Sequence, residues 1–176
     1  MQLLIAYKQQ YDFNSVNLIP VNMYGPKDNF DPRTSHVIPA LILKFHKAMR
    51  DFPHDNVEIW GTGKASREFL YAPDCAEAIV MAMEEHDDPS PINIGTGKEI
   101  SIKELAYKIA DLMGYQGSIY FNSKYPDGQP RRCLDVSKAK EAFDFTAKTG
   151  FDKGLEQTIE WFRQRSGHFD DYLDNI

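Results

Sequence analysis

The chain has 176 residues, of which 42% are hydrophobic and 12% aromatic, so it is long enough and apolar enough to bury a core. This composition excludes a disordered or low-complexity polypeptide. The formal net charge of -6 argues against nucleic acid as a partner, because binding to phosphates requires a surplus of Lys and Arg.

The cysteines and the apolar stretches indicate the compartment. Cys75 and Cys133 stand apart, in no metal-ligand spacing, which suits a reducing compartment and predicts no metal ion. The longest strongly apolar stretch, residues 37–43, contains a proline and is too short to span a bilayer. The first residues lack the pattern of a signal peptide. We therefore expect a cytoplasmic protein with no membrane partner.

In chain order, the first predicted elements are a helix and a buried strand. Residues 1–11 carry apolar side chains at helical spacing, although no Ser, Thr, Asp or Asn precedes them as a cap. Residues 15–20 are apolar on both faces, as expected of a strand inside a parallel sheet. Since such a strand needs neighbours, the chain has the character of the latter half of a larger fold.

Helices and short strands alternate along the rest of the chain. Further helices are predicted at residues 37–49, 73–83, 101–112, 136–143 and 154–165, and further strands at residues 57–60, 67–71, 92–94 and 118–121. Ser101 and Glu104 have the spacing of a capping box, and Gly114 stands where that helix should end. The alternation predicts an α/β fold, followed by a loosely held tail from Ser166.

Two glycine-rich segments separate predicted elements. Residues 61–63 supply a turn between two predicted strands. Residues 95–97 read Gly-x-Gly, but the third glycine and the distal acidic residue of a dinucleotide-binding fingerprint are missing. A tight strand-to-helix turn is therefore expected at 95–97 rather than a phosphate-binding loop.

His36 is the first candidate for chemistry. It closes the loop that follows the strand at residues 15–20, and α/β enzymes place reactive groups at the carboxyl ends of such strands. Histidine is the side chain best suited to donate or accept a proton near neutral pH. The alternative is a histidine that packs against or caps the first turn of the next helix.

Five further residues are candidates for ligand binding. Lys44 lies about 12 Å along the same helix from the histidine. Trp60 and Arg67 flank the turn at 61–63, where an indole can stack on a base and a guanidinium can bind phosphate with paired donors. Asp127 and Arg132 bound a turn-forming segment. The alternatives are a solvated lysine, a core tryptophan, an arginine paired with Glu68 or Asp74, and a surface turn.

Five motifs carry a family resemblance: Tyr-Gly-Pro-x-Asp-Asn-Phe at 24–30, Ser-His-Val-Ile-Pro at 35–39, Trp-Gly-x-Gly at 60–63, Arg-Glu-Phe-Leu at 67–70 and Asp-Gly-x-Pro-Arg at 127–131. They resemble GDP-L-fucose synthases, NADP-dependent epimerase-reductases of the extended short-chain dehydrogenase family. The resemblance covers residues 1–162 and is weakest after Arg132. Because the third and fourth motifs are shared widely, another NAD-dependent sugar-nucleotide epimerase or dehydratase is the alternative.

The resemblance implies conversion of GDP-4-keto-6-deoxymannose to GDP-L-fucose, by epimerisation at two carbons and hydride transfer from NADPH. It implies that His36 acts as an acid in epimerisation and touches the cofactor. It also implies that the backbone of Pro20, Val21, Asn22 and Met23 lies beside the nicotinamide.

For the nucleotide-sugar, the resemblance implies five binding residues, with Arg67 on the diphosphate: Lys44, Trp60, Arg67, Asp127 and Arg132. The family has lysine in place of arginine at position 132, a change that keeps the charge but not the geometry.

The resemblance further implies a division into domains. Residues 1–30 and 67–95 would be remnants of a Rossmann-type dinucleotide-binding domain, residues 31–66 and 96–165 a small α/β substrate-binding domain, and residues 166–176 a tail. The first helix would pack in a homodimer interface.

The Gly-x-x-Gly-x-x-Gly loop and the Tyr-x-x-x-Lys pair of this family do not occur in the expected context. Three explanations stay open: a fragment of a synthase, a half that assembles with a separate N-terminal half, and a stand-alone nucleotide-sugar-binding or scaffold module. We expect NADP(H) to serve the parent enzyme without binding to this chain alone, and we expect the isolated chain to lack reductase activity.

Overall fold

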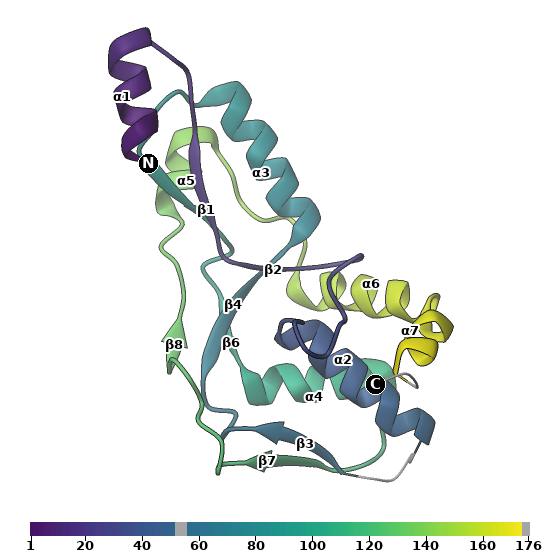
Figure 1. Ribbon diagram of the computed structural model, residues 1–176. Helices are drawn as coiled ribbons and strands as arrows, with labels where there is room; N and C mark the ends of the chain where they lie inside the picture. Colours follow the sequence, from purple (N-terminus) through teal and green to yellow (C-terminus); the bar gives the residue numbers. More distant parts are fainter. Residues whose placement is uncertain (52–55, 174–176) are drawn as a thin grey trace. The chain divides into compact units, whose positions relative to one another are not determined.

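The structure is a computed structural model that describes residues 1–51 and 56–173 (Figure 1). Its elements are α1 Gln2–Tyr11, β1 Asn17–Pro20, β2 Asn22–Tyr24, α2 Val37–Asp51, β3 Val57–Trp60, β4 Ser66–Tyr71, α3 Ala72–Glu85, β5 Pro91–Ile94, β6 Glu99–Ser101, α4 Ile102–Met113, β7 Ile119–Asn122, β8 Arg131–Arg132, α5 Ser137–Phe143, α6 Phe151–Arg163 and α7 Ser166–Leu173. The predicted α/β class is confirmed, and every predicted helix and strand is present within a few residues of its expected bounds.

The chain divides into two compact units. Unit 1 comprises residues 1–23, 68–99 and 132–151, and unit 2 comprises residues 24–67, 100–131 and those from 152 onward. The sequence groups residues 96–165 together, whereas the structure places residues 132–151 in unit 1. The physical reason is that α5 packs against β5 and α3, where it buries Ala139 and Phe143.

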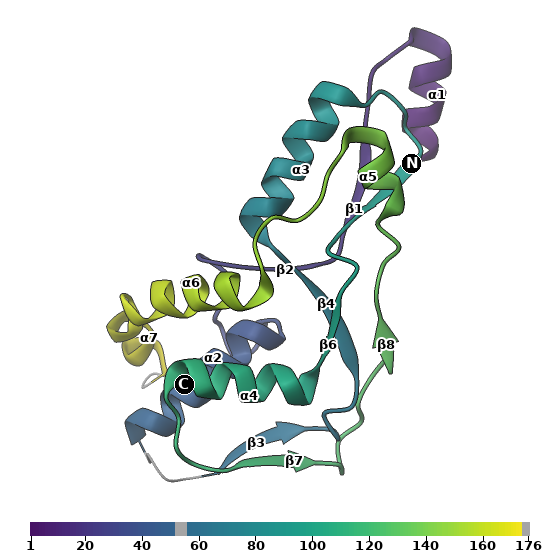
Figure 2. The ribbon, with the colours of Figure 1, turned by 180° about the vertical axis from the view of Figure 1, so that it is seen from behind.

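Unit 1 is built on a pair of parallel strands. β1 pairs with β5 in a parallel register that places Asn17 opposite Pro91 and Pro20 opposite Ile94, so the predicted parallel strand is confirmed. Its predicted burial is wrong: no residue of β1 is buried and Ile19 is 42% exposed, because within the described residues β1 pairs with β5 alone. The helices α3 and α5 lie beside these strands (Figure 2). The core between them includes the following buried side chains: Leu70, Cys75, Ala78, Ala82, Ile92, Ile94, Ala139 and Phe143.

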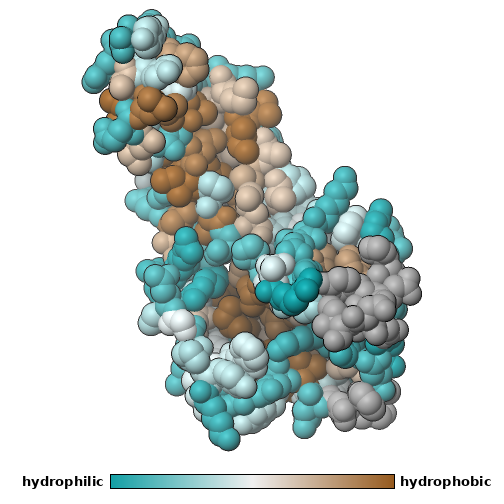
Figure 3. All heavy atoms as spheres, viewed as in Figure 1, coloured by the Kyte–Doolittle hydropathy of each residue, from teal (hydrophilic) through white to brown (hydrophobic). Residues whose placement is uncertain are grey.

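Unit 1 also exposes apolar side chains. No residue of α1 is buried, and its Leu3 is 67% exposed. Met83, on α3, is 70% exposed. Figure 3, drawn in the same view as Figure 1, shows hydrophobic residues gathered over β1 and α3. Among the described residues, no helix combines the length and the apolar character needed to cross a bilayer.

Unit 2 packs helices against a second parallel pair. β3 pairs with β7, with Val57 opposite Ile119 and Trp60 opposite Asn122. Along β3, Val57 and Ile59 are buried whereas Glu58 and Trp60 point outward, so one face of the pair meets the helices and the other meets solvent. α2 packs against both α4 and β3.

The segments around α4 form as their sequence predicts. Ser101 Oγ accepts a hydrogen bond from the Glu104 amide at 3.1 Å, and the Glu104 carboxylate accepts one from the Ser101 amide at 3.0 Å. This is the expected capping box. The helix ends at Gly114, whose φ of 77° is left-handed.

The predicted tail differs from the structure. Residues 166–173 form α7, and the Phe169 ring stacks on Phe162 with centroids 4.9 Å apart. This aromatic contact holds the segment, so a loosely held tail is wrong for these residues. The last three predicted tail residues, 174–176, lie outside the described residues.

The turn at residues 61–63 links strands of different sheets. β3 pairs with β7, while β4 lies between β2 and β6 and also pairs with β8. The sequence indicates β3 and β4, but it gives no signal for the short strands β2, β6 and β8.

Candidate functional site

The predicted site residues divide between the units. Unit 1 holds Pro20, Val21, Asn22, Met23 and Arg132, and unit 2 holds His36, Lys44, Trp60, Arg67 and Asp127. All predicted nucleotide-sugar residues except Arg132 therefore belong to one compact unit.

Trp60 is exposed and stacked. Its indole is 62% exposed and lies parallel to the ring of Tyr125, with centroids 4.5 Å apart and an interplanar angle of 17°. Tyr125 is itself 41% exposed. A core position for Trp60 is therefore wrong, because its place on β3 turns the indole outward. The pair offers an aromatic surface to solvent.

Lys44 places a cation beside this aromatic pair. Its Nζ lies 5.6 Å from the centroid of the Trp60 ring, within range of a cation–π interaction, and donates a hydrogen bond to the Glu58 carbonyl at 2.9 Å. Desolvation of the ammonium lowers the pKa of Lys44, and the nearby Glu58 carboxylate partly offsets that effect. Lys44 is therefore held in place, in contrast to a freely solvated lysine.

Asp127 binds the turn after β3. One oxygen of its carboxylate accepts a bond from the Thr62 amide at 2.6 Å, and the other accepts one from the Thr62 hydroxyl at 2.6 Å. These bonds hold the pKa of Asp127 below its ordinary value of 3.8. Both carboxylate oxygens are thus engaged within the chain, which fixes the segment 125–130 to the turn 61–63. We call this contact the Asp127 clamp.

Arg67 lies against the same segment. Its Nη1 donates to the Ser66 carbonyl at 2.6 Å and to the Gln129 carbonyl at 2.7 Å. Among the described residues Arg67 makes no ion pair, so the alternative of a pairing with Glu68 or Asp74 is wrong. Its Nε and Nη2 make no hydrogen bond within this part of the chain. These two nitrogens of a positioned guanidinium carry three N–H donors, which are available for an anion.

His36 stands at the entrance to α2. Its side chain is exposed, and its carbonyl accepts the first helical bond from the Ala40 amide at 3.0 Å. Within the described residues its ring makes no hydrogen bond, so a role as side-chain cap is wrong. The imidazole is accessible to a ligand, as proton transfer requires.

The predicted cofactor segment follows β1. Val21 is buried, and its amide donates to the Ile94 carbonyl at 2.9 Å. The Asn22 side chain donates to the Glu68 carbonyl at 3.0 Å, whereas Pro20 and Met23 are exposed. The segment therefore lies at the carboxyl end of a parallel strand, where α/β folds bind ligands. Arg132 is exposed on β8.

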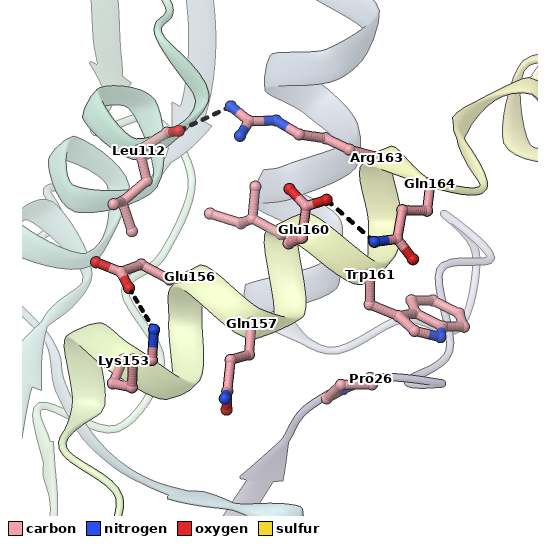
Figure 4. A pocket seen from close by; sticks show the side chains of 10 residues that line it. Pro26, Leu112, Lys153, Glu156, Gln157, Glu160, Trp161, Arg163 and Gln164 are labelled. Carbon is pink, nitrogen blue, oxygen red and sulfur yellow. Dashed lines mark hydrogen bonds and ion pairs between the residues drawn. The ribbon is translucent and has the colours of Figure 1, made fainter.

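A hollow of about 590 Å³ lies elsewhere in unit 2, along α6 (Figure 4). None of the predicted residues lines it. Its charged side chains are satisfied locally: Lys153 pairs with Glu156 at 3.3 Å, and Arg163 donates to the Leu112 carbonyl at 2.8 Å. We therefore assign no site there. In the described part of the chain, no group of three His, Cys, Asp or Glu side chains could hold a metal ion.

A profile described as the NAD dependent epimerase/dehydratase family matches residues 1–95. The chain belongs to this family. The match covers β1, the segment 20–23 and the residues from His36 to Arg67, and it ends at the first glycine of the turn 95–97.

Curated relatives of this family member carry the name that its motifs predict. The probable GDP-L-fucose synthase 1 of Oryza sativa subsp. japonica is 40% identical over 157 residues, which cover 89% of this chain and 47% of the relative. The GDP-L-fucose synthase of Escherichia coli (strain K12) is 39% identical over 178 residues, which cover 96% of this chain and 55% of the relative. The predicted resemblance is confirmed, and the chain spans about half the length of the curated relatives it matches.

Solved structures agree with the family assignment. A GDP-L-fucose synthetase from Naegleria fowleri matches with a TM-score of 0.86 and 28% identity, covering 94% of this chain and 52% of that chain. A second structure of that synthetase, bound to NADP, matches with a TM-score of 0.83. The predicted Rossmann-type fold of an epimerase-reductase is thereby confirmed.

Sequence reasoning missed a buried carboxylate in this epimerase-family chain. Glu68 is 0% exposed and accepts hydrogen bonds from the amides of Thr96 at 2.6 Å, Gly97 at 2.8 Å and Leu134 at 2.7 Å. The tight turn expected at 95–97 is present, but it leads from β5 to the short strand β6 and not directly into a helix. Its amides bind a carboxylate of the chain itself. The sequence signal that was available is the position of Glu68 in a predicted strand, directly before three apolar residues.

Proposed function

We propose that this chain is the nucleotide-sugar-binding part of an NADP-dependent epimerase-reductase that converts GDP-4-keto-6-deoxymannose to GDP-L-fucose. The single observation that carries the proposal is the grouping of Trp60 and Arg67 along the segment 125–130 within unit 2. An aromatic surface and a positioned guanidinium are the groups that a base and a diphosphate require. The named relatives support the choice of sugar nucleotide.

Each cation has a distinct role in this proposal. Arg67 binds the diphosphate through the donors that its bonds to Ser66 and Gln129 leave available. Lys44 adds a positive charge beside the base-binding indole. Arg132, exposed on β8, is a further candidate to bind the substrate. Asp127 acts through its clamp on Thr62, which holds the segment that carries the Arg67 contact.

His36 supplies the acid in the proposed epimerisation. Removal of the proton from a carbon next to the keto group gives an enolate, and return of a proton to the opposite face inverts that carbon. An exposed imidazolium at the start of α2 can deliver the second proton, and the neutral imidazole then recovers a proton from solvent. No residue of this chain is assigned as the base that removes the first proton.

NADP(H) is the reductant that the proposal implies, and the described residues fit it only in part. Residues 20–23 lie suitably at the end of β1. The amides of the turn 95–97 are not available to bind the pyrophosphate, because they already donate hydrogen bonds to Glu68. We therefore derive no hydride step here, and we propose that NADP(H) binding needs a cofactor half outside this chain.

Association is part of the same proposal. The exposed side chains of α1, Leu3, Tyr7 and Tyr11, would be covered in a homodimer or by a separate N-terminal half. Neither Cys75 nor Cys133 forms a disulfide, which agrees with the proposed cytoplasmic location.

Calorimetric titration of the chain with GDP-mannose, GDP and NADPH tests the proposal. We expect binding of both GDP ligands and no binding of NADPH. Arg67→Ala should weaken GDP binding about 10- to 100-fold, as loss of a hydrogen-bonded charge predicts. Arg163→Ala is the matched control, since Arg163 also donates to a backbone carbonyl in unit 2. Equal affinity of the chain and Arg67→Ala for GDP would reject the proposal, and preference for UDP would indicate another epimerase or dehydratase.

A further inference from the structure

We propose that Tyr125 is a positioning residue of this site, which backs the Trp60 indole and so presents it to a planar nucleobase. The inference rests on the proposed function, because it assumes that Trp60 meets the base of a nucleotide. Tyr125 lies outside all five motifs that carry the family resemblance. Its role therefore comes from the geometry of this chain.

The strand register brings the two rings together. Trp60 lies opposite Asn122 in the β3–β7 pair. The Tyr125 amide then donates to the Asn122 carbonyl at 3.2 Å, which closes a turn after β7. This turn carries the Tyr125 ring back over Trp60. The Asp127 clamp holds the following residues to the turn 61–63, so the stack is fixed from both ends.

The spacing of the rings decides how a base can bind. Their centroids are 4.5 Å apart, whereas a base between them would need roughly twice that separation. A base must therefore add to the outside of the stack. With Tyr125 behind it, the indole cannot rotate freely on the exposed end of β3. A ring held in its binding orientation loses less conformational entropy when the ligand arrives.

Two further observations favour a base over an isolated anion or a sugar. Both rings remain substantially exposed, at 62% for Trp60 and 41% for Tyr125, which is a large aromatic surface to leave in water. Lys44 adds a cation 5.6 Å from the indole centroid. An aromatic platform beside a positive charge is the arrangement with which proteins bind nucleotides by stacking.

The test uses the chain with Trp161→Phe, so that Trp60 is the only tryptophan. GDP and inorganic pyrophosphate are titrated by calorimetry, and the fluorescence of Trp60 is followed in parallel. Tyr125→Ala should weaken GDP binding about fivefold to tenfold and leave pyrophosphate binding within about twofold. Tyr125→Phe should restore GDP binding, because it keeps the ring. GDP should also quench Trp60 less in Tyr125→Ala.

Two controls separate positioning from general structure. Tyr107→Ala removes another exposed tyrosine of unit 2, which contacts Phe121 with centroids 6.4 Å apart, and should leave GDP binding unchanged. Tyr125→Leu keeps an apolar side chain but no ring, and should behave like Tyr125→Ala.

Equal losses for GDP and pyrophosphate, or failure of Tyr125→Phe to restore binding, would overturn the role of Tyr125. GDP binding that needs Arg67 but not Tyr125 would remove this inference and leave the proposed function standing. No GDP binding by the unsubstituted chain would reject both.

Discussion

The two Gly-Thr-Gly-Lys segments of this chain, residues 61–64 and 95–98, can be compared directly. In each, a carboxylate from a distant residue binds the threonine amide at 2.6 Å: Asp127 binds Thr62, and Glu68 binds Thr96. Asp127 is exposed whereas Glu68 is fully buried. The same tetrapeptide thus lies at the edge of the proposed nucleotide site in unit 2, and in unit 1 it binds a buried carboxylate of the chain itself. Each tetrapeptide forms a turn whose threonine amide binds an acid, and the two turns differ in whether that acid is exposed or buried.

The largest expected effect is on stability, through the buried Glu68 carboxylate and the amides that it binds. Glu68→Ala leaves three backbone amides without their acceptor, and each such loss costs about 1–3 kcal/mol. We therefore predict a loss of at least about 3 kcal/mol in the free energy of unfolding, measured by urea denaturation. Glu68→Gln keeps one acceptor oxygen and should lose less. A loss below about 1 kcal/mol for Glu68→Ala would contradict the structural role given to this carboxylate.

The next largest effect is expected at Gly61, where the absence of a side chain leaves room for the Asp127 clamp. Gly61 has a φ of 88°, and a β-carbon there would overlap the Asp127 carboxylate. Gly114 has a similar φ of 77° but open space around it, so Gly114→Ala reports backbone strain alone, about 1 kcal/mol. Gly61→Ala should be more destabilising than Gly114→Ala and should also weaken GDP binding. Equal effects of the two substitutions on stability and binding would argue against the clamp.

Much of this comparison could not be predicted from the sequence. Local patterns were sufficient where no distant contact is needed: the capping box of Ser101 and Glu104 is present as expected. The strand β1 pairs in parallel as expected, but it is not buried. The contacts of Asp127 with Thr62 and of Tyr125 with Trp60 each span 65 residues, and they depend on the pairing of β3 with β7. No local pattern specifies that pairing.

The placement of residues 132–151 in unit 1 and the burial of Glu68 were not predicted, for a related reason. Helix α5 follows the segment 125–130 of unit 2 in sequence, but its Ala139 and Phe143 complete the core of unit 1. Glu68 lies next to Arg67 and has the composition of an exposed ion pair. Only the fold shows that three amides converge on its carboxylate.

A smaller effect is the response of the Asp127 clamp to pH. Its hydrogen bonds lower the pKa of Asp127, so the bonds should persist above the ordinary value of 3.8 and be lost only as the pH falls through the lower folded value. The chemical shift of the Thr62 amide should titrate with a midpoint below 3.8, and that transition should vanish in Asp127→Asn. A midpoint at or above the ordinary value would mean that the clamp does not form in solution.

The smallest expected effect is on the cation beside the stack. Lys44→Met removes the ammonium that lies 5.6 Å from the Trp60 ring and should weaken GDP binding about twofold to fivefold, as a partly exposed cation–π contact predicts. Lys47→Met, on the same helix, is the matched control and should leave affinity unchanged. If both substitutions reduce GDP affinity equally, Lys44 contributes through its positive charge alone and not through its position beside Trp60.

The most direct test of the central claim is a map of chemical-shift changes in the chain on addition of GDP. The claim is that unit 2 binds the nucleotide while the turn 95–97 is closed by Glu68. We predict shifts of the Trp60 indole N–H and the Arg67 side chain, and none at the amides of Thr96 and Gly97. Shifts confined to those two amides, or no shift at Trp60 and Arg67 under saturating GDP, would contradict the account.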